Sequence, residues 1–313
     1  EPFSTDTVDF PNVRTFKFNA LNKAYTNWAG SGNDNAYESF CNEQSFWLDD
    51  YALFLTLGQK YGTQVWCQWP KISVERDKQE LESVKKTQSA EIECIKFYQY
   101  ILYKQWKELK TYCNQKGLLL VGDMPIYVSY ESADVWVHRN NFKLDSNGKP
   151  VKVSGVPPDY FSATGQLWNN PVYDWDNVRK SDFKWWMQRM KSLFSLFDIV
   201  RIDHFRGLVQ YWEINAGEKT AINGKWEDVP THEFLDALKK QSETFPVIAE
   251  DLGIITPDVY QVMNEYNLPG MKVLMFAFGE DNPSNPYLPH NYERNSVVYT
   301  GTHDNNTMRG WLE

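Results

Sequence analysis

Short apolar segments alternate with longer helical segments through residues 118–313, and this alternation restricts the fold more than any other feature of the chain. The predicted strands are residues 118–121, 199–202, 247–249, 273–278 and 297–300. The predicted helices among them are residues 175–196, 231–243 and 256–266. Strands that are apolar on both faces and separated by helices are typical of a parallel sheet covered by helices. We therefore expect an α/β fold, either a (β/α)8 barrel of the TIM type or an open doubly wound sheet.

Acidic residues cluster where these strands end, at Asp123, Asp203, Glu250 and Asp304. In a (β/α)8 barrel the carboxyl ends of the strands form the active-site face, so stability alone does not explain such a cluster. No Gly-x-Gly-x-x-Gly turn follows any predicted strand, which disfavours a dinucleotide-binding doubly wound sheet. The barrel is the favoured prediction.

Arg201 and Asp203 lie two positions apart at the end of a predicted strand, so their side chains are expected on the same side. The guanidinium is expected to lower the pKa of the Asp203 carboxyl and keep it ionised. Glu250 follows an apolar strand, so burial and nearby like charges are expected to raise its pKa. Two acids with opposite environments, together with Asp304, indicate glycosidic-bond chemistry.

The composition narrows the range of partners. A net charge of -9 disfavours nucleic acid and anionic membrane surfaces, because either partner needs a basic face. The four cysteines are too widely spaced for a zinc site or a disulfide framework, which fits a reducing compartment; they are Cys41, Cys67, Cys94 and Cys113. No segment has the length and apolar character of a membrane span, and residues 1–15 do not have the order of a signal peptide.

Residues 1–117 are predicted to be mainly helical, with helices from Asp9 to Trp28, over residues 46–60, and as one or two long helices within residues 71–117. Residues 138–170 are expected to form a long loop. Loops of this length in a compact domain are usually functional or disordered, and the aromatic content here favours function. Tyr160 and Trp168 in this loop are candidates for excluding water and positioning an acceptor.

Seven segments, taken together and in this order, resemble the 4-α-glucanotransferases, also called amylomaltases or disproportionating enzymes, which are relatives of the α-amylases. The segments are Gly122 to Val128, Ser132 to Trp136, Gly155 to Pro171, Arg201 to Gly207, Ala249 to Gly253, Pro269 to Val273, and Tyr299 to Asn305. Each segment alone is a weak signal. All seven in the family's order, over nearly the whole chain, are a specific signal.

The resemblance implies a role for each candidate residue. Asp203 is implied as nucleophile, Glu250 as acid/base, and Asp304 as a third acid that grips sugar hydroxyls. Further implied substrate contacts are Arg201 and His303 at the attacked glucose, Asn305, Gln166 and Trp168 near the acceptor side or the rim of the site, and Asp123 as a residue that shapes the site. The implied substrates are α-1,4-glucans and maltooligosaccharides, with no metal or organic cofactor.

The resemblance also bears on the extent of the chain. Family members carry barrel strands before the first residue and after the last residue of this sequence. We therefore expect residues 1–313 to be the catalytic (β/α) barrel segment of a longer enzyme, incomplete at both ends and with helical insertions. Within it, residues 1–117 form the mainly helical part and residues 118–313 carry the acids. The expected compartment is the cytoplasm, or the plastid if the source is photosynthetic.

Alternative interpretations stay open. An isolated Arg-x-Asp pair such as Arg201 and Asp203 is more often a structural ion pair than a nucleophile, and Trp168 alone is equally consistent with packing and with sugar stacking. A retaining α-glucan hydrolase uses the same acids. A catalytically inactive glucan-binding protein is a third alternative, which the presence of all three acids disfavours.

Overall fold

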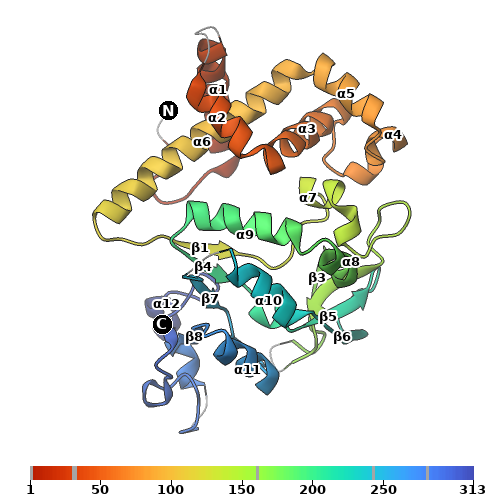
Figure 1. Cartoon of the computed structure of the whole chain (residues 1–313). Coiled ribbons are helices and arrows are strands. Elements are labelled where there is room, and N and C mark those ends of the chain that lie inside the picture. Colours follow the sequence, from red (N-terminus) through yellow and green to blue (C-terminus); the bar gives the residue numbers. More distant parts are fainter. Residues whose placement is uncertain (1–2, 30–33, 160–161, 242–243, 280–281) are drawn as a thin grey trace. The chain divides into compact units, whose positions relative to one another are not determined.

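A computed structural model describes residues 3–29, 34–159, 162–241, 244–279 and 282–313 (Figure 1). The chain forms two compact units. The first comprises Glu1–Thr111 and Glu131–Val137, and the second comprises Tyr112–Tyr130 and His138–Glu313.

The first unit is built from helices. These are α1 (Phe10–Ala29), α2 (Asn35–Glu43), α3 (Ser45–Tyr61), α4 (Lys71–Val74), α5 (Lys78–Thr87), most of α6 (Ser89–Gln115), and α7 (Ala133–Val137). Asp34 and Asp77 begin α2 and α5, because each carboxylate accepts hydrogen bonds from two backbone N–H groups of the first turn. The core includes the fully buried Trp136, whose indole N–H donates to the carbonyl of Ser73 (3.0 Å).

The helix expected over residues 46–60 is confirmed as α3, whereas α2 was not expected. The expectation of one or two long helices over residues 71–117 is wrong, because α4, α5 and α6 divide that stretch. Arg76 adopts a left-handed backbone conformation (φ 57°), and a helix cannot continue through it. The helix is therefore interrupted immediately before Asp77.

Among its described residues, the second unit contains five strands that pair in parallel. These are β1 (Val121–Met124), β4 (Ile199–Ile202) and β7 (Val247–Ala249) in the order β1-β4-β7, and the pair β8 (Gly270–Val273) and β9 (Ser296–Tyr299). The N–H of Ala249 donates to the carbonyl of Pro269 (2.9 Å), which links β7 to the start of β8. Helices α9 (Lys184–Leu196), α10 (Thr231–Lys239) and α11 (Pro257–Glu265) precede β4, β7 and β8 in the chain (Figure 1). The parallel α/β arrangement is confirmed.

The strand boundaries differ from expectation at two places. The first strand begins at Val121 rather than Leu118, and both Leu118 and Leu119 are exposed. The fourth strand covers Gly270–Val273, and the apolar residues Leu274–Phe278 that follow it form a 3-10 helix. A short apolar run does not by itself distinguish a strand from a buried helical turn.

Residues 138–170 are not simply a loop, and that expectation is corrected. They contain β2 (Lys152–Val156) and the first part of β3 (Gln166–Pro171), which join β5 (Gln210–Asn215) and β6 (Gly224–Asp228) in an antiparallel sheet of order β3-β2-β5-β6. This sheet packs on a small core of Val153, Ile214 and Ala221. The strands were missed because β3 is mostly polar and partly exposed, and because its partners are distant in sequence. The remaining helices are α8 (Trp175–Lys180) and α12 (Met308–Leu312).

Gly155 lies in β2 where the backbone of β3 leaves no room for a side chain. A Cβ there would lie 2.3 Å from the carbonyl oxygen of Gln166 and 2.7 Å from Cδ1 of Ile214. We expect Gly155→Ala to lower the free energy of unfolding by about 2 kcal/mol, because β2 and β3 must separate. Denaturant unfolding of the full-length gene product measures the loss. Gly279→Ala is the control, since no atom lies within 4 Å of a Cβ at that position; equal stability of the two variants would contradict the prediction.

Candidate active site

Four of the predicted site residues lie together at the carboxyl ends of three adjacent parallel strands. They are Asp123 in β1, Arg201 in β4, Asp203 just after β4, and Glu250 just after β7. Asp123 pairs with Arg201 in the strand register, and the N–H of Glu250 donates to the carbonyl of Ile202 (3.0 Å). Because the register continues to the strand ends, the sheet itself brings these side chains together.

The guanidinium of Arg201 is buried and uses all three of its nitrogens. Its Nη1 donates to both carboxylate oxygens of Asp123 (2.7 Å each), and its Nη2 donates to Oδ1 of Asp203 (2.9 Å). Its Nε donates to the thioether Sδ of Met271 in β8 (3.3 Å). One cation therefore holds two carboxylates from neighbouring strands.

The pKa of Asp203 is raised from its ordinary value. Arg201 does lower this pKa, as expected, but the expected net lowering is wrong. Burial is the largest cause, and the charges of Asp123 and Asp304 add to it. Arg201 opposes the rise but shares its charge with Asp123. The Arg201–Asp203 contact was predicted correctly, whereas the desolvation of the carboxylate was underestimated.

The pKa of Glu250 is raised to about 7, as expected for the general acid. Burial is the main cause, and the negative charge of Asp203 also raises it. The backbone N–H groups of Leu252 and His204 donate to its two oxygens (2.8 Å each) and limit the rise. A carboxyl with a pKa near 7 is present in both its protonated and its ionised form at neutral pH, so it can donate a proton and later accept one.

The third acid, Asp304, lies on the loop after β9 and is exposed. Its charge contributes to the raised pKa of Asp203, so the two acids are electrostatically coupled. His303 lies beside it, with Nε2 3.4 Å from Oδ1 of Asp304. The side-chain oxygen of Asn305 accepts hydrogen bonds from the backbone N–H and the hydroxyl of Thr302 (3.0 and 3.1 Å), which closes the turn that carries all three residues.

Gln166 and Trp168 lie on β3, and the indole N–H of Trp168 donates to Oε1 of Gln166 (3.1 Å). The Trp168 ring lies edge-to-face against the ring of His204, with centroids 4.9 Å apart. This contact places Trp168 against the residue that follows the nucleophile candidate in the chain. Tyr160, the remaining predicted substrate contact, lies outside the described residues.

His204 was missed by the sequence reasoning. It directly follows Asp203 in a left-handed conformation (φ 53°), and its backbone N–H donates to Glu250. Burial, aided by the charge of Arg206, lowers the pKa of its imidazole to about 4, so the ring is neutral at pH 7. Its position next to Asp203 was the available signal.

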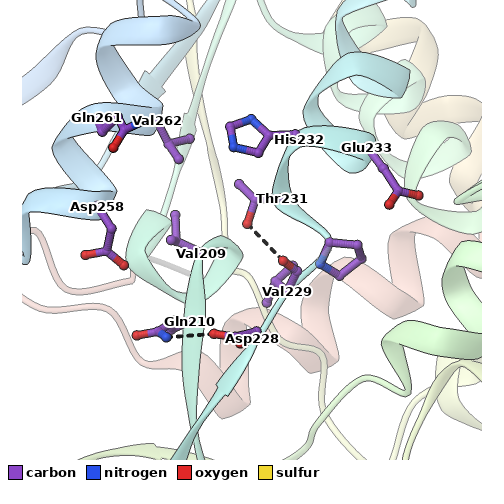
Figure 2. A pocket seen from close by; sticks show the side chains of 11 residues that line it. Val209, Gln210, Asp228, Val229, Thr231, His232, Glu233, Asp258, Gln261 and Val262 are labelled. Atoms are coloured by element: carbon purple, nitrogen blue, oxygen red, sulfur yellow. Dashed lines mark hydrogen bonds between the residues drawn. The ribbon is translucent and has the colours of Figure 1, made fainter.

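A separate hollow of about 430 Å³ lies between the start of β5, the end of β6, and helices α10 and α11 (Figure 2). Its lining residues include none of the three candidate acids. Several of its polar groups already have partners. Gln210 donates to Asp228 (2.7 Å), and Thr231 donates to the carbonyl of Val229 (3.1 Å). The acids at the strand ends, rather than this hollow, form the candidate active site.

Two further observations concern metal binding and membrane insertion. Over the described ranges, no three His, Cys, Asp or Glu side chains form a group that could hold a metal ion. In the same part of the chain, no helix is both long enough and apolar enough to cross a membrane.

Comparison with known proteins gives consistent matches. The family model described as 4-alpha-glucanotransferase matches residues 2–313. The chain is 46% identical over 309 residues to a 4-alpha-glucanotransferase of Clostridium butyricum, with 98% of this chain and 63% of the relative covered. It is 43% identical over 317 residues to the chloroplastic/amyloplastic 4-alpha-glucanotransferase of Solanum tuberosum, with 100% and 55% covered. The chain thus spans less than two thirds of the length of these relatives.

Among solved structures, the chain is similar to amylomaltase from Streptococcus agalactiae in complex with acarbose. The TM-score is 0.94 at 36% sequence identity, and the match covers 99% of this chain and 63% of that chain. This similarity confirms the expected α/β fold class.

The raised pKa of Glu250 predicts a pH-dependent stability. The folded chain binds this proton more tightly than the unfolded chain, in which the carboxyl has its ordinary pKa of 4.5. The resulting stabilisation is complete below pH 4.5 and is lost as the pH rises through about 7. Relative to Glu250→Gln, which does not titrate, the wild type should lose about 3 kcal/mol of unfolding free energy over this interval.

Chemical unfolding of the full-length gene product at several pH values measures this difference. Glu75→Gln, at an exposed position, is the control for removing a carboxylate from the surface. If the difference in unfolding free energy between wild type and Glu250→Gln stays constant from pH 4.5 to 8, the raised pKa of Glu250 is contradicted.

Proposed function

This chain belongs to the 4-alpha-glucanotransferase family, and on that premise we propose that it transfers α-1,4-glucan segments between maltodextrins by a retaining mechanism. Family membership agrees with the resemblance drawn from the seven sequence segments. The observation that carries the proposal is the pair of acids at adjacent strand ends. Asp203 is bound by Arg201, and Glu250 has a pKa of about 7.

In the proposed first step, an oxygen of Asp203 attacks the anomeric carbon of the donor sugar. The bond from that carbon to the glycosidic oxygen breaks, and Glu250 gives its proton to this oxygen. The products are a covalent glycosyl ester of Asp203 and a shortened glucan with a free 4-hydroxyl. Arg201 keeps the attacking carboxylate in place, and its single positive charge offsets part of the negative charge of Asp123 and Asp203.

In the second step, ionised Glu250 removes the proton from the 4-hydroxyl of an acceptor glucan, whose oxygen attacks the anomeric carbon and releases Asp203. Two inversions at that carbon restore its configuration. We assign Asp304 and His303 to the hydroxyls of the attacked sugar. Gln166, Trp168, Asn305 and Tyr160 are assigned to the acceptor side.

We propose that residues 1–313 are the barrel segment of a longer enzyme, with a mainly helical part over residues 1–117 and the acids within residues 118–313. We propose a cytoplasmic location, or a plastid location if the source is photosynthetic. The latter has a parallel in the chloroplastic/amyloplastic name of the Solanum tuberosum relative.

Incubation of the full-length gene product with maltotriose tests the proposed activity. A transferase produces glucose together with oligomers longer than maltotriose, whereas a hydrolase produces none longer. Asp203→Asn should reduce the rates at which glucose and the longer oligomers form by several orders of magnitude, because the covalent intermediate cannot form. The matched control is Asp228→Asn, a carboxylate of the separate hollow. Near-normal turnover by a folded Asp203→Asn variant would refute the nucleophile assignment.

Trp168 should influence the partition between transfer and hydrolysis. Its aromatic ring contacts His204, the residue after the proposed nucleophile, where it can exclude water and offer a face to an acceptor sugar. We expect Trp168→Ala to lower the ratio of oligomers longer than maltotriose to hydrolysis products severalfold, with a smaller effect on total cleavage. Product analysis by chromatography measures the ratio, and Trp106→Ala on helix α6 is the control. An unchanged ratio would assign Trp168 to packing alone.

A further inference from the structure

Asp251 is a buried carboxyl that the proposed mechanism does not use, although it directly follows Glu250. It is 4% exposed, and its Oδ1 accepts a 2.6 Å hydrogen bond from the backbone N–H of Met271. Gly270 permits this close approach, since a Cβ there would lie 2.6 Å from Oδ2 of Asp251. Asp251 therefore fixes the first residues of β8 against the end of β7.

Other charged and titratable groups surround this carboxyl. Burial raises the pKa of Asp251, whereas the Met271 N–H and the positive charge of the buried Lys272 oppose the rise. Glu293 and Tyr260 interact with the Asp251 carboxyl electrostatically and more weakly. A buried carboxyl with a short backbone hydrogen bond and a nearby cation has little freedom to move.

Met271 connects this carboxyl to the candidate active site. Its backbone is held by Asp251, and its thioether Sδ accepts from Nε of Arg201 (3.3 Å). The other two guanidinium nitrogens of Arg201 hold Asp123 and Asp203. The thioether therefore limits rotation of the guanidinium on the side away from the two carboxylates.

We propose that Asp251 is a positioning residue for the reaction: through Met271 it fixes the orientation of Arg201, and through Arg201 it fixes the carboxylate of Asp203. The proposal rests on the proposed function, in which Asp203 is the nucleophile. In this role Asp251 contacts neither substrate nor reacting atoms.

The test compares three variants of the full-length gene product acting on maltotriose. Asp251→Ala removes the acceptor for the Met271 N–H, and Met271→Leu removes the sulfur acceptor for Arg201 while keeping an apolar side chain. Both should lower kcat roughly tenfold to a hundredfold, with KM within about twofold, because the nucleophile is displaced rather than the sugar contacts. Asp251→Asn keeps an oxygen that can accept from Met271, so most of kcat should be retained.

The pH profile separates positioning from a purely structural role. The acid limb of kcat/KM reports Asp203, whose pKa is set by burial, by Arg201, by Asp123 and Asp304, and by its coupling to Glu250. If Arg201 loses its orientation, its positive charge supports the Asp203 carboxylate less well. The acid limb should then move to higher pH in both Asp251→Ala and Met271→Leu.

Glu213→Gln is the matched control. Glu213 is a 3% exposed carboxylate in the antiparallel sheet, paired with Lys143 and Lys152. Its replacement should lower the unfolding temperature without moving the acid limb. If Asp251→Ala and Met271→Leu give this same pattern, the positioning role is overturned and Asp251 is only structural.

The two proposals can fail separately. If the wild type hydrolyses maltotriose without forming oligomers longer than maltotriose, the proposed transfer fails. A shift of the acid limb of hydrolysis in Asp251→Ala and Met271→Leu would still support the positioning role. If the wild type forms longer oligomers and the acid limb stays fixed in both variants, only the positioning role fails. Met271→Leu, which leaves Asp251 intact, keeps the test decisive if Asp251→Ala does not fold.

Discussion

The buried guanidinium of Arg201 is the interaction on which the rest of the candidate site depends. It is the cation that binds both Asp123 and Asp203, and the parallel register of β1 and β4 places it between them. The guanidinium side chain is only 10% exposed, whereas both carboxylate side chains are 44% exposed. Removing a carboxylate therefore leaves the less hydrated partner, the cation, without full compensation. The geometry of the site therefore depends on the sheet. The carboxylates of Asp123 and Asp203 lie close together because strand pairing places Arg201 between them.

The α/β character of residues 118–313 could be predicted because short apolar segments alternate there with longer helical segments. The antiparallel sheet could not. Its strand β3 is mostly polar, Gly155 lies within β2, and the pairing of β2 with β5 joins residues about sixty positions apart. Local periodicity does not carry information on such distant pairing, and a long polar segment was therefore assigned to a loop.

The candidate site also has features that the sequence predicted and features that it did not. The contact of Arg201 with Asp203 followed from the two-residue period of a strand, and the raised pKa of Glu250 followed from its apolar neighbours. The net direction of the Asp203 pKa did not follow, because it depends on how deeply the chain buries that carboxyl and on how Arg201 divides its charge. The role of His204 could not be predicted either. It donates a hydrogen bond to Glu250 from its backbone N–H, and this donation depends on a left-handed backbone conformation.

The pKa of about 7 at Glu250 suits the near-zero free-energy change of the proposed reaction. Exchanging one α-1,4 linkage for another leaves the bond energy nearly unchanged, so the equilibrium is close to thermoneutral and each half-reaction is the approximate reverse of the other. A catalyst of such an exchange gains nothing from favouring one direction. A carboxyl that is half-protonated at neutrality supplies proton donor and proton acceptor in equal amounts, and so matches the symmetry of the exchange.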